Sequence, residues 1–267
     1  MSDIRFSHIE RVFTRGTASH AVLKDVNLHV DTQEFVSIVG PSGCGKTTML
    51  RLAAGLDTPT SGEISVGGRA VEGPGPDRAV VFQQFALFPW KTVSENIEFG
   101  LRCMGMRANE RAERVKHYLQ LMNLEGRGEA YPHQLSGGMQ QRVAIARSYA
   151  LDPQVLLMDE PFGALDAQTR TVMQEELLRI CSASRRTVLF ITHAVEEAVY
   201  LSDRVIVMGR NGGAIVADID IRSSRLAEDW TAHKRIEDVM DLPSFLDLRT
   251  RIWKLLREQE PETVPNI

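Results

Sequence analysis

The fold is decided by the stretch Gly40-Pro-Ser-Gly-Cys-Gly-Lys-Thr47. Residues 35–39 before it form an apolar run typical of a buried strand, and residues 48–52 after it begin a helix that we expect to end at Gly55. Glycines in such a loop let backbone N–H groups curl around phosphate oxygens, and the positive N-terminus of the helix points at the same oxygens. The stretch therefore predicts a P-loop that binds a nucleoside triphosphate.

Two side chains at the end of this loop have predicted roles. We expect the Lys46 ammonium to lie between the β- and γ-phosphates, and the Thr47 hydroxyl to ligate Mg²⁺. The alternative, an accidental glycine-rich turn, is disfavoured by the strand and the helix on either side. The loop residues predicted to bind the nucleotide are Gly40, Pro41, Ser42, Gly43, Cys44, Gly45, Lys46, Thr47 and Thr48.

Composition limits the kind of protein this can be. The 267 residues suffice for one α/β domain with a subdomain. The net charge is −4 and no basic run stands out, so binding to nucleic acid is disfavoured. The odd number and scattered positions of Cys44, Cys103 and Cys181 indicate free thiols in a reducing cytosol. The N-terminus lacks a signal peptide and no apolar run reaches the ~18–20 residues of a membrane span, so we expect any membrane role to come through a partner.

The pattern of apolar residues predicts an α/β order. Alternation between residues 4 and 66 predicts an antiparallel β layer, and residues 79–82 are expected to form a short buried strand. Helical character dominates residues 93–150, where the helix that carries Val115 and Met122 is expected to end at Gly126 and Gly128. The apolar face of a helix over residues 242–259 predicts packing on the core, with docking of a partner as the alternative. Parallel strands separated by helices are expected at residues 155–158, 187–191 and 205–208.

The strand at residues 155–158 ends in two acids, Asp159 and Glu160. The carboxyl ends of parallel strands meet at the edge where a P-loop also opens, so both carboxylates are expected beside the phosphates. There Asp159 is predicted to hold Mg²⁺ and Glu160 to orient the attacking water. Two solvated acids after a strand are common, and it is the upstream P-loop that favours the functional interpretation.

The segment Leu135-Ser-Gly-Gly-Met-Gln-Gln-Arg142 resembles the signature motif of ABC-type ATPases. It stands between the P-loop and the two acids, as in that family. Ser136 is expected to cap an amphipathic helix that begins with Met139 and Val143, and the bare N–H groups of Gly137 and Gly138 would form a second phosphate binder. An ordinary capped helix is the alternative.

The resemblance covers residues 4–208 and implies an α/β fold, a P-loop NTPase with a RecA-like parallel sheet core, an N-terminal antiparallel β layer and an inserted α-helical subdomain. It places a single ABC ATPase domain over residues 1–267. Its expected parts are the nucleotide-binding core with the β layer (1–87 and 151–230), the helical subdomain with the signature motif (88–150) and a C-terminal helical tail (231–267).

Further positions match the family. Gln83 resembles the Q-loop glutamine, which reaches Mg²⁺ and the reacting water, with Gln84 as the neighbouring alternative. His193 resembles the switch histidine that hydrogen-bonds the γ-phosphate. The resemblance thus implies Glu160, His193 and Gln83 as catalytic residues, and Thr47, Gln83 and Asp159 as metal ligands.

Two more positions concern nucleotide contacts. Asp166 ends a segment, residues 163–166, that resembles the D-loop coupling the two sites of a dimer, although its first residue is Gly where Ser is commoner. Phe13 stands where the family stacks an aromatic ring under adenine, and a simple core phenylalanine is the alternative.

The resemblance also implies partners. In the family the signature faces the γ-phosphate held by another copy, which implies a homodimer with two ATP molecules between its subunits. Residues 86–97, with Trp90 after Pro89, and the tail resemble the nitrate/sulfonate/taurine group of bacterial importers. This implies a peripheral subunit on the cytoplasmic face of the inner membrane that energises uptake of a small anionic solute through a permease, served by a periplasmic or extracellular binding protein.

Two alternatives belong to other functional classes. A soluble, non-transport ABC ATPase of repair, translation or cofactor assembly predicts a coiled-coil insertion, a second ATPase domain or a basic face, none of which the sequence contains. A nucleotide-dependent scaffold without turnover predicts a substitution at Glu160 or His193, and both residues are intact.

Overall fold

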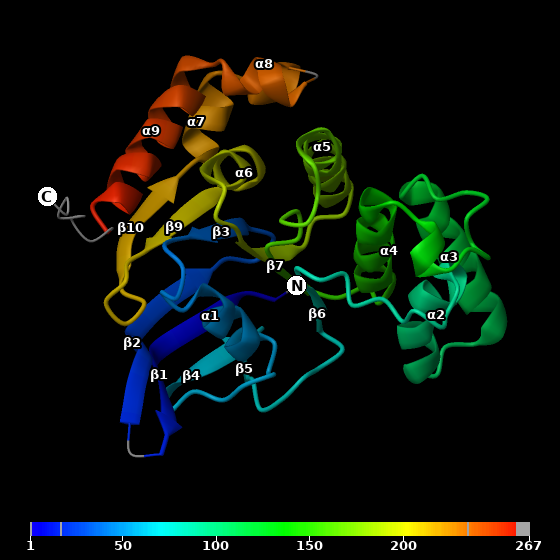
Figure 1. Cartoon of the computed structure of the whole chain (residues 1–267), viewed down its shortest axis with the longest axis horizontal. Coiled ribbons are helices and arrows are strands. Elements are labelled where there is room, and N and C mark those ends of the chain that lie inside the picture. Colours follow the sequence, from blue (N-terminus) through cyan, green and yellow to red (C-terminus); the bar gives the residue numbers. More distant parts are fainter. Residues whose placement is uncertain (1, 17, 234, 260–267) are drawn as a thin grey trace, which may run out of the picture.

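Two β-sheets, with helices between and around them, make up the fold of the computed structural model, which describes residues 2–16, 18–233 and 235–259 (Figure 1). The strands are β1 (Ile4–Arg15), β2 (Ala18–Val30), β3 (Phe35–Val39), β4 (Ser61–Val66), β5 (Arg69–Ala70), β6 (Arg78–Val81), β7 (Val155–Asp159), β8 (Thr187–Ile191), β9 (Arg204–Met208) and β10 (Ile215–Asp220). The helices are α1 (Lys46–Ala53), α2 (Val93–Cys103), α3 (Ala108–Leu121), α4 (Gly137–Ala150), α5 (Ala167–Ala183), α6 (Val195–Leu201), α7 (Arg222–Ala227), α8 (Ile236–Met240) and α9 (Pro243–Arg257), with short 3-10 turns at η1 (Pro132–Gln134) and η2 (Trp230–Ala232).

The larger sheet has six strands in the order β10-β9-β3-β8-β7-β6. Strands β9, β3, β8, β7 and β6 are parallel, so their carboxyl ends lie at one edge of the sheet, and the P-loop follows β3 in the middle of that edge. The predicted α/β fold with a parallel core is confirmed. The edge strand β10 runs antiparallel to β9. The apolar pattern of the sequence does not predict this strand, because Ile219 is its only buried residue.

The two faces of the six-stranded sheet are covered by separate hydrophobic cores. In β3 the side chains of Val36 and Ile38 enter the core shared with α1 and the smaller sheet, whereas Phe35 and Val39 enter the core beneath α4, α5, α6 and α9. Since both faces are buried, alternate positions are equally apolar, and the strands appear in the sequence as unbroken apolar runs.

The smaller sheet is the predicted N-terminal antiparallel layer, with the strand order β2-β1-β4-β5. Helix α1 lies between the two sheets, where it contacts β4 on one side and β7 and β8 on the other. The helix ends as predicted: Gly55 takes a left-handed conformation at φ +71°, and the N–H of Leu56 donates to the carbonyl of Arg51 at 2.9 Å.

Helices α2, α3 and α4 pack on one another at one end of the six-stranded sheet (Figure 1). A reciprocal capping box starts α2, where the Thr92 hydroxyl accepts from the N–H of Glu95 and the Glu95 carboxylate accepts from the N–H of Thr92. The predicted division of the chain at residues 88 and 150, and at residue 231, stays a prediction.

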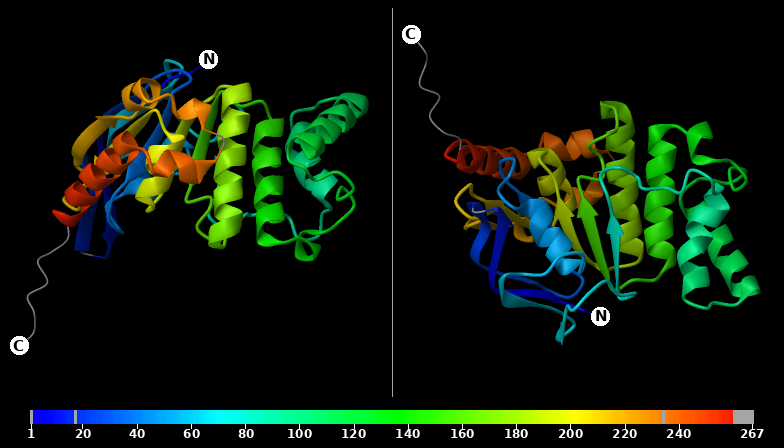
Figure 2. Two further views of the ribbon diagram at one scale, coloured as in Figure 1. Left: turned by 90° about the horizontal axis from the view of Figure 1, so that it is seen from above. Right: turned by 60° about the horizontal axis from the view of Figure 1, so that its bottom comes forward.

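Helix α4 is not amphipathic, and that prediction is wrong. Its four central residues, 143–146, are all buried, because α2 and α3 cover one side of the helix and β6 and α5 cover the other. Figure 2 shows α4 and α5 side by side. A helix with neighbours all round needs apolar residues all round.

Two predicted boundaries are also wrong. Helix α3 ends at Leu121, before Gly126 and Gly128, because Asn123 takes a left-handed conformation at φ +52° and stops the helix there. Strand β6 ends at Val81, and Phe82 is 36% exposed where the chain leaves the sheet.

Helix α9 packs on the core as predicted. Phe245 and Ile252 are completely buried and Leu248 nearly so. The Trp230 ring lies 5.6 Å from the Phe245 ring, and its indole N–H donates to the Ser244 hydroxyl at 3.0 Å. The tail helix is therefore part of the same core that covers the sheet.

Two expectations from composition agree with the structure. Cys44, Cys103 and Cys181 are free thiols. None of the described helices combines the length and the apolar character that crossing a bilayer requires.

We expect Phe245→Ala to lower the free energy of unfolding by about 3–5 kcal/mol, because it empties a fully buried site in a close-packed core. Leu246→Ala is the matched control, since Leu246 is its neighbour on α9 but is 37% exposed; we expect it to cost about 1 kcal/mol or less. Urea denaturation followed by circular dichroism measures both. Equal losses in the two variants would contradict the packing of α9 on the core through Phe245.

Candidate nucleotide-binding site

The P-loop turns sharply between β3 and α1. Gly43 and Gly45 have φ values of +79° and +106°, which side chains with a Cβ rarely adopt. A Cβ on Gly45 would also lie 2.6 Å from Cδ2 of Leu23, so the loop packs closely against β2. The loop therefore requires glycine at this position for both conformation and space, and its N–H groups open toward the start of α1.

The Lys46 side chain is folded over the loop. Its ammonium donates to the carbonyl oxygens of Gly40 at 2.7 Å and of Pro41 at 3.0 Å, and the residue is only 7% exposed. A positive charge is thus held at the mouth of the phosphate loop. Cys44 beneath it is buried, and burial raises the pKa of its thiol, so it acts as a small apolar residue.

A pocket of about 320 Å³ opens at this loop. It contains the predicted side chains of Lys46, Thr47 and Glu160, together with Val22 of β2, which the sequence does not single out because nothing in the motif points to it. Besides Val22 and Glu160, its lining consists of six residues of the predicted P-loop: Ser42, Gly43, Gly45, Lys46, Thr47 and Thr48.

Thr47, which lines the pocket, contacts Asp159, 112 residues further along the sequence. The Thr47 hydroxyl donates to a carboxylate oxygen of Asp159 at 3.1 Å. Burial raises the pKa of Asp159, an effect that the Thr47 hydrogen bond opposes and the charge of Glu160 adds to. One hydroxyl and one carboxylate beside a phosphate pocket are hard oxygen ligands suited to Mg²⁺, which takes its remaining ligands from phosphate and water.

Glu160 is held in an uncommon backbone conformation. Its φ is +45°, and its N–H donates to the carbonyl of Ile191 at 2.9 Å while its carbonyl accepts from the N–H of Gly163 at 3.0 Å. These bonds on both sides hold a left-handed conformation that a residue other than glycine rarely adopts.

The Glu160 carboxylate is shared by two predicted site residues. The same oxygen lies 3.3 Å from the Gln83 amide nitrogen and 3.2 Å from Nδ1 of His193. Gln83, and not Gln84, is therefore the glutamine directed at the acid. The His193 side chain is 65% exposed, so it reaches Glu160 from the solvent side.

The register of the sheet brings these residues together. Ile38 pairs with Ile191, and Ile191 pairs with Asp159, so three strands end in one row. Site residues follow each of these strands: the P-loop comes directly after β3, Glu160 comes directly after β7, and His193 follows β8 after one intervening residue. Gln83 follows β6, next to β7.

The signature segment lies elsewhere. Ser136 caps α4, and its hydroxyl accepts from the N–H of Met139 at 3.4 Å. Gly137 is exposed but Gly138 is buried, and a Cβ on Gly138 would lie 2.5 Å from the Thr169 side chain, so α5 packs closely against the second glycine. Phosphate binding by their N–H groups stays a prediction. Figure 1 places α4 and α1 apart, with β6 and β7 between them.

Asp166 and Phe13 also lie outside the pocket lining. Asp166 caps α5, where its carboxylate accepts from the N–H of Thr169 at 3.0 Å, and this bond lowers its pKa. Phe13 is 43% exposed, and the Arg11 guanidinium lies 4.4 Å from its ring centroid. The alternative of a core phenylalanine is wrong, and adenine stacking by Phe13 stays a prediction.

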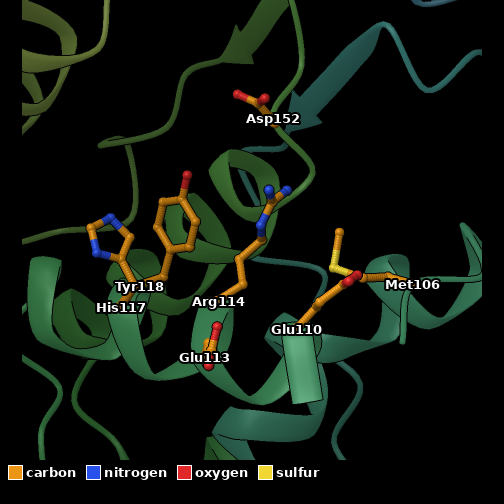
Figure 3. Close-up of a pocket in the computed structure, with 7 residues that line it drawn as sticks. All are labelled: Met106, Glu110, Glu113, Arg114, His117, Tyr118 and Asp152. Carbon is orange, nitrogen blue, oxygen red and sulfur yellow. The ribbon is translucent and has the colours of Figure 1, made fainter. Parts of the chain in front are cut away.

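A larger cavity, of about 530 Å³, lies on α3 and is not part of this site (Figure 3). Its lining contains the acids Glu110, Glu113 and Asp152. The Arg114 guanidinium in it already donates to the carbonyl of Ala150 at 3.1 Å. Its lining has no glycine-rich turn, so this cavity lacks the row of backbone N–H groups that makes the P-loop a phosphate site.

Comparison with known proteins identifies the family. The sequence profile described as ABC transporter matches residues 23–163, more than half of the chain. The chain belongs to the ABC transporter family. Among curated relatives of this ABC protein, the nitrate import ATP-binding protein NrtD of Synechocystis sp. (strain ATCC 27184 / PCC 6803 / Kazusa) is 48% identical over 97% of this chain and 97% of its own length.

Two further proteins resemble this ABC chain over most of its length. The taurine import ATP-binding protein TauB of Pelagibacter ubique (strain HTCC1062) is 41% identical over 98% of both chains. A solved structure of the ATP-binding cassette MJ0796, a dimer in a post-hydrolysis state bound to ADP and Pi, superposes with a TM-score of 0.73 at 34% identity, and the match covers 82% of this chain and 99% of that one. The resemblance that the signature segment indicated is confirmed, and the chain is an ABC ATPase that binds and hydrolyses ATP.

We expect Asp159→Asn in this ABC ATPase to separate stability from activity. Because burial raises the pKa of Asp159, its ionised carboxylate lowers the free energy of unfolding at neutral pH; this cost disappears as the pH falls through the raised pKa to about 4. Asparagine still accepts from Thr47 but carries no charge for a metal. ATP hydrolysis with Mg²⁺ should fall at least about ten-fold.

Urea denaturation of the nucleotide-free protein measures the stability. At neutral pH Asp159→Asn should unfold at a urea concentration no lower than the unmodified chain. Any gain should shrink as the pH falls through the raised pKa of Asp159, because the folded aspartate then becomes protonated. A variant that is less stable at neutral pH would contradict burial as the cause of the raised pKa.

Proposed function

We propose that this chain is the ATP-hydrolysing subunit of a bacterial ABC importer, energising uptake of a small anionic solute such as nitrate, a sulfonate or taurine through a partner permease. One observation carries the ATPase part. The Thr47–Asp159 pair and the shared carboxylate of Glu160 meet at the mouth of the same P-loop pocket. A metal holder and a water-orienting base around one γ-phosphate are what hydrolysis requires.

The residues divide the chemistry between them. Lys46, folded over the loop, and the N–H groups of the loop would hold the phosphates. Thr47 and Asp159, together with Gln83, would hold Mg²⁺. The chemistry that Mg²⁺ would supply there is positive charge that offsets the charge of the phosphates. Glu160 orients the water, and His193 donates to the γ-phosphate from the position in which its ring now faces Glu160.

The arrangement favours a head-to-tail homodimer. The signature helix α4 lies away from the chain's own P-loop, and both Ser136 and Gly137 at its start are exposed, so they could face a nucleotide held by a second copy. The matching MJ0796 structure is itself a dimer. Two ATP molecules would then lie between the subunits, each held by one P-loop and one signature segment.

An apolar groove beside the Gln83 segment supports a permease partner. It has a volume of about 450 Å³ and lies between β6 and the helices α2 and α4, with Leu56, Phe82, Phe88 and Phe99 in its lining. The sequence does not reveal this groove, because its lining comes from six separate segments. An apolar groove of this kind suits an amphipathic helix of a partner.

The rim of the groove is held in place. The buried Asn96 accepts from the N–H of Phe88 at 2.8 Å and donates to its carbonyl at 3.2 Å. Arg147 of α4 donates to the carbonyl of Ala86 at 2.8 Å. Trp90 then stands out from this fixed rim, 71% exposed, with its ring 5.8 Å from that of Phe88.

The proposed cargo rests on relatives. Proteins named for nitrate import and taurine import match this chain over nearly its whole length. We place this subunit at the cytoplasmic face of the membrane as a peripheral protein bound to a permease. A separate substrate-binding protein on the other side delivers the anionic solute.

We expect Glu160→Gln to trap a dimer with ATP, because the amide cannot serve as the base while the phosphate contacts remain. Size-exclusion chromatography with light scattering, at saturating ATP and Mg²⁺, measures the mass. Lys46→Ala is the control, since it removes a phosphate contact and should leave a monomer. A Glu160→Gln chain that binds ATP and stays monomeric counts against the two-site dimer.

Capture of the permease tests the transport function. The tagged chain, expressed in its own cell and purified from detergent-solubilised membranes, should bring down a polytopic membrane protein identified by mass spectrometry. Trp90→Ala should reduce that capture by about ten-fold or more, as expected when an exposed aromatic anchor is lost from an interface. Trp253→Ala is the matched control, because Trp253 is also exposed, at 42%, but lies on α9.

The outcomes of this experiment discriminate between functions. Capture that depends on Trp90 but not on Trp253 supports the importer subunit and its groove. Recovery of soluble partners alone, in a preparation that hydrolyses ATP, would move the assignment to a non-transport ABC ATPase. Nitrate, taurine and alkanesulfonates, added in turn to the reconstituted complex, then identify the solute that stimulates hydrolysis.

A further inference from the structure

A buried carboxylate lies behind the histidine that faces Glu160. Glu197 of α6 is only 5% exposed, so its carboxylate is buried in the core. One of its oxygens accepts from the Thr192 hydroxyl at 2.6 Å. The other accepts from the Gln174 amide of α5 at 3.1 Å and lies 3.7 Å from Nε of Arg170, also on α5. Glu197 therefore joins α5 and α6 to the end of β8.

Thr192 fixes the chain on both sides of His193. Its N–H donates at 3.3 Å to the carbonyl of Ile38, in the strand that leads into the P-loop. Its hydroxyl, while donating to Glu197, accepts from the N–H of Ala194 at 3.0 Å. Thr192 is 1% exposed, whereas the side chain of His193 between these two residues is 65% exposed.

We propose that Glu197 is a positioning residue for ATP hydrolysis, which through Thr192 sets the imidazole of His193 against the carboxylate of Glu160. This inference rests on the proposed function, in which Glu160 and His193 act on the reacting water and phosphate. Glu197 hydrogen-bonds to neither group. It is linked to the chain beside His193 through the Thr192 hydroxyl, and its charge also interacts with that of His193. An exposed histidine has few packing contacts of its own, so its direction is set by the backbone on either side.

The energetics support this role. A buried carboxylate whose hydrogen bonds come only from neutral groups is costly to the fold, and burial raises the pKa of Glu197. Arg170 compensates only in part, because its Nε is too distant for a hydrogen bond and its side chain is 36% exposed. The hydrogen bonds among Gln174, Glu197 and Thr192 form a buried polar network, and such a network holds its members in a single geometry.

The network also reaches the segment before α5. The Arg170 guanidinium donates to the carbonyl of Leu165 at 3.0 Å, one residue before the Asp166 cap. The chain around residues 163–166 and the chain around His193 are thus tied to the same buried acid. A movement of α5 relative to β8 would change the hydrogen bonds of Glu197, and through them the position of His193.

Steady-state ATPase kinetics on four variants test the inference. Glu197→Ala and Thr192→Val each remove the link, and we expect kcat to fall about ten- to a hundred-fold, the loss typical of a misplaced catalytic group, with KM for ATP within about two-fold. Thr192→Ser keeps the hydroxyl and should restore most of the activity. Glu196→Ala is the matched control: Glu196 neighbours Glu197 on α6, and its side chain has no hydrogen bond or ion pair in the described structure.

A double-mutant cycle with His193→Ala separates positioning from general support of the fold. If Glu197 acts through the histidine, then Glu197→Ala adds less than about two-fold to the loss already caused by His193→Ala. A structural defect would multiply the two losses. Multiplying losses, or a folded Thr192→Val chain with unchanged kcat, would overturn the inference even if Glu197→Ala fails to fold.

The same cycle shows which proposal has failed. Full activity of His193→Ala would refute the role of the histidine in the proposed function. A large loss in His193→Ala, together with an independent loss in Glu197→Ala, would refute the positioning role alone. Urea midpoints and the affinity for a fluorescent ATP analogue, measured on every variant, confirm that the compared proteins are folded and bind nucleotide.

Discussion

The parallel alignment of β6, β7, β8 and β3 is the constraint on which the rest of the structure depends. Hydrogen bonds between these strands fix where each one ends, so that Ile38, Ile191 and Asp159 fall in one row. The loops that follow these strands, although far apart in the sequence, therefore lie at one edge of the sheet. Because such a sheet is buried on both faces, the helices and the smaller sheet cover it, and only that edge remains for chemistry.

At that edge the side chains depend on one another. Glu160 sits in a left-handed conformation that the backbone of Ile191 and Gly163 holds in place, and its carboxylate is shared by Gln83 and His193. Thr47 and Asp159 form a second pair beside it. No single strand supplies a complete set of groups for hydrolysis, so the site is sensitive to any shift of one strand end against another.

Two connections lead away from the site. Gln83 begins the segment that continues to Ala86 and Phe88 at the rim of the apolar groove, so a partner in that groove would act on the residue that contacts Glu160. On the opposite side, Glu197 ties Thr192 to α5. The ATP site thus lies between a surface suited to a partner and the helix that follows residues 163–166, which is a physical route for coupling hydrolysis to movement.

Local motifs determined much of this protein from the sequence alone. The P-loop, the two acids after residues 155–158 and the signature segment each need particular side chains at fixed spacing, and the buried strands appear as unbroken apolar runs. The tertiary structure alone decided that Val22 lines the pocket, that Phe13 is exposed, that the central residues 143–146 of α4 are all buried and that Glu197 hydrogen-bonds to the residue before His193. Each of these features depends on packing between segments that are distant in the chain. The pattern of apolar residues within one segment does not indicate which other segments it will contact.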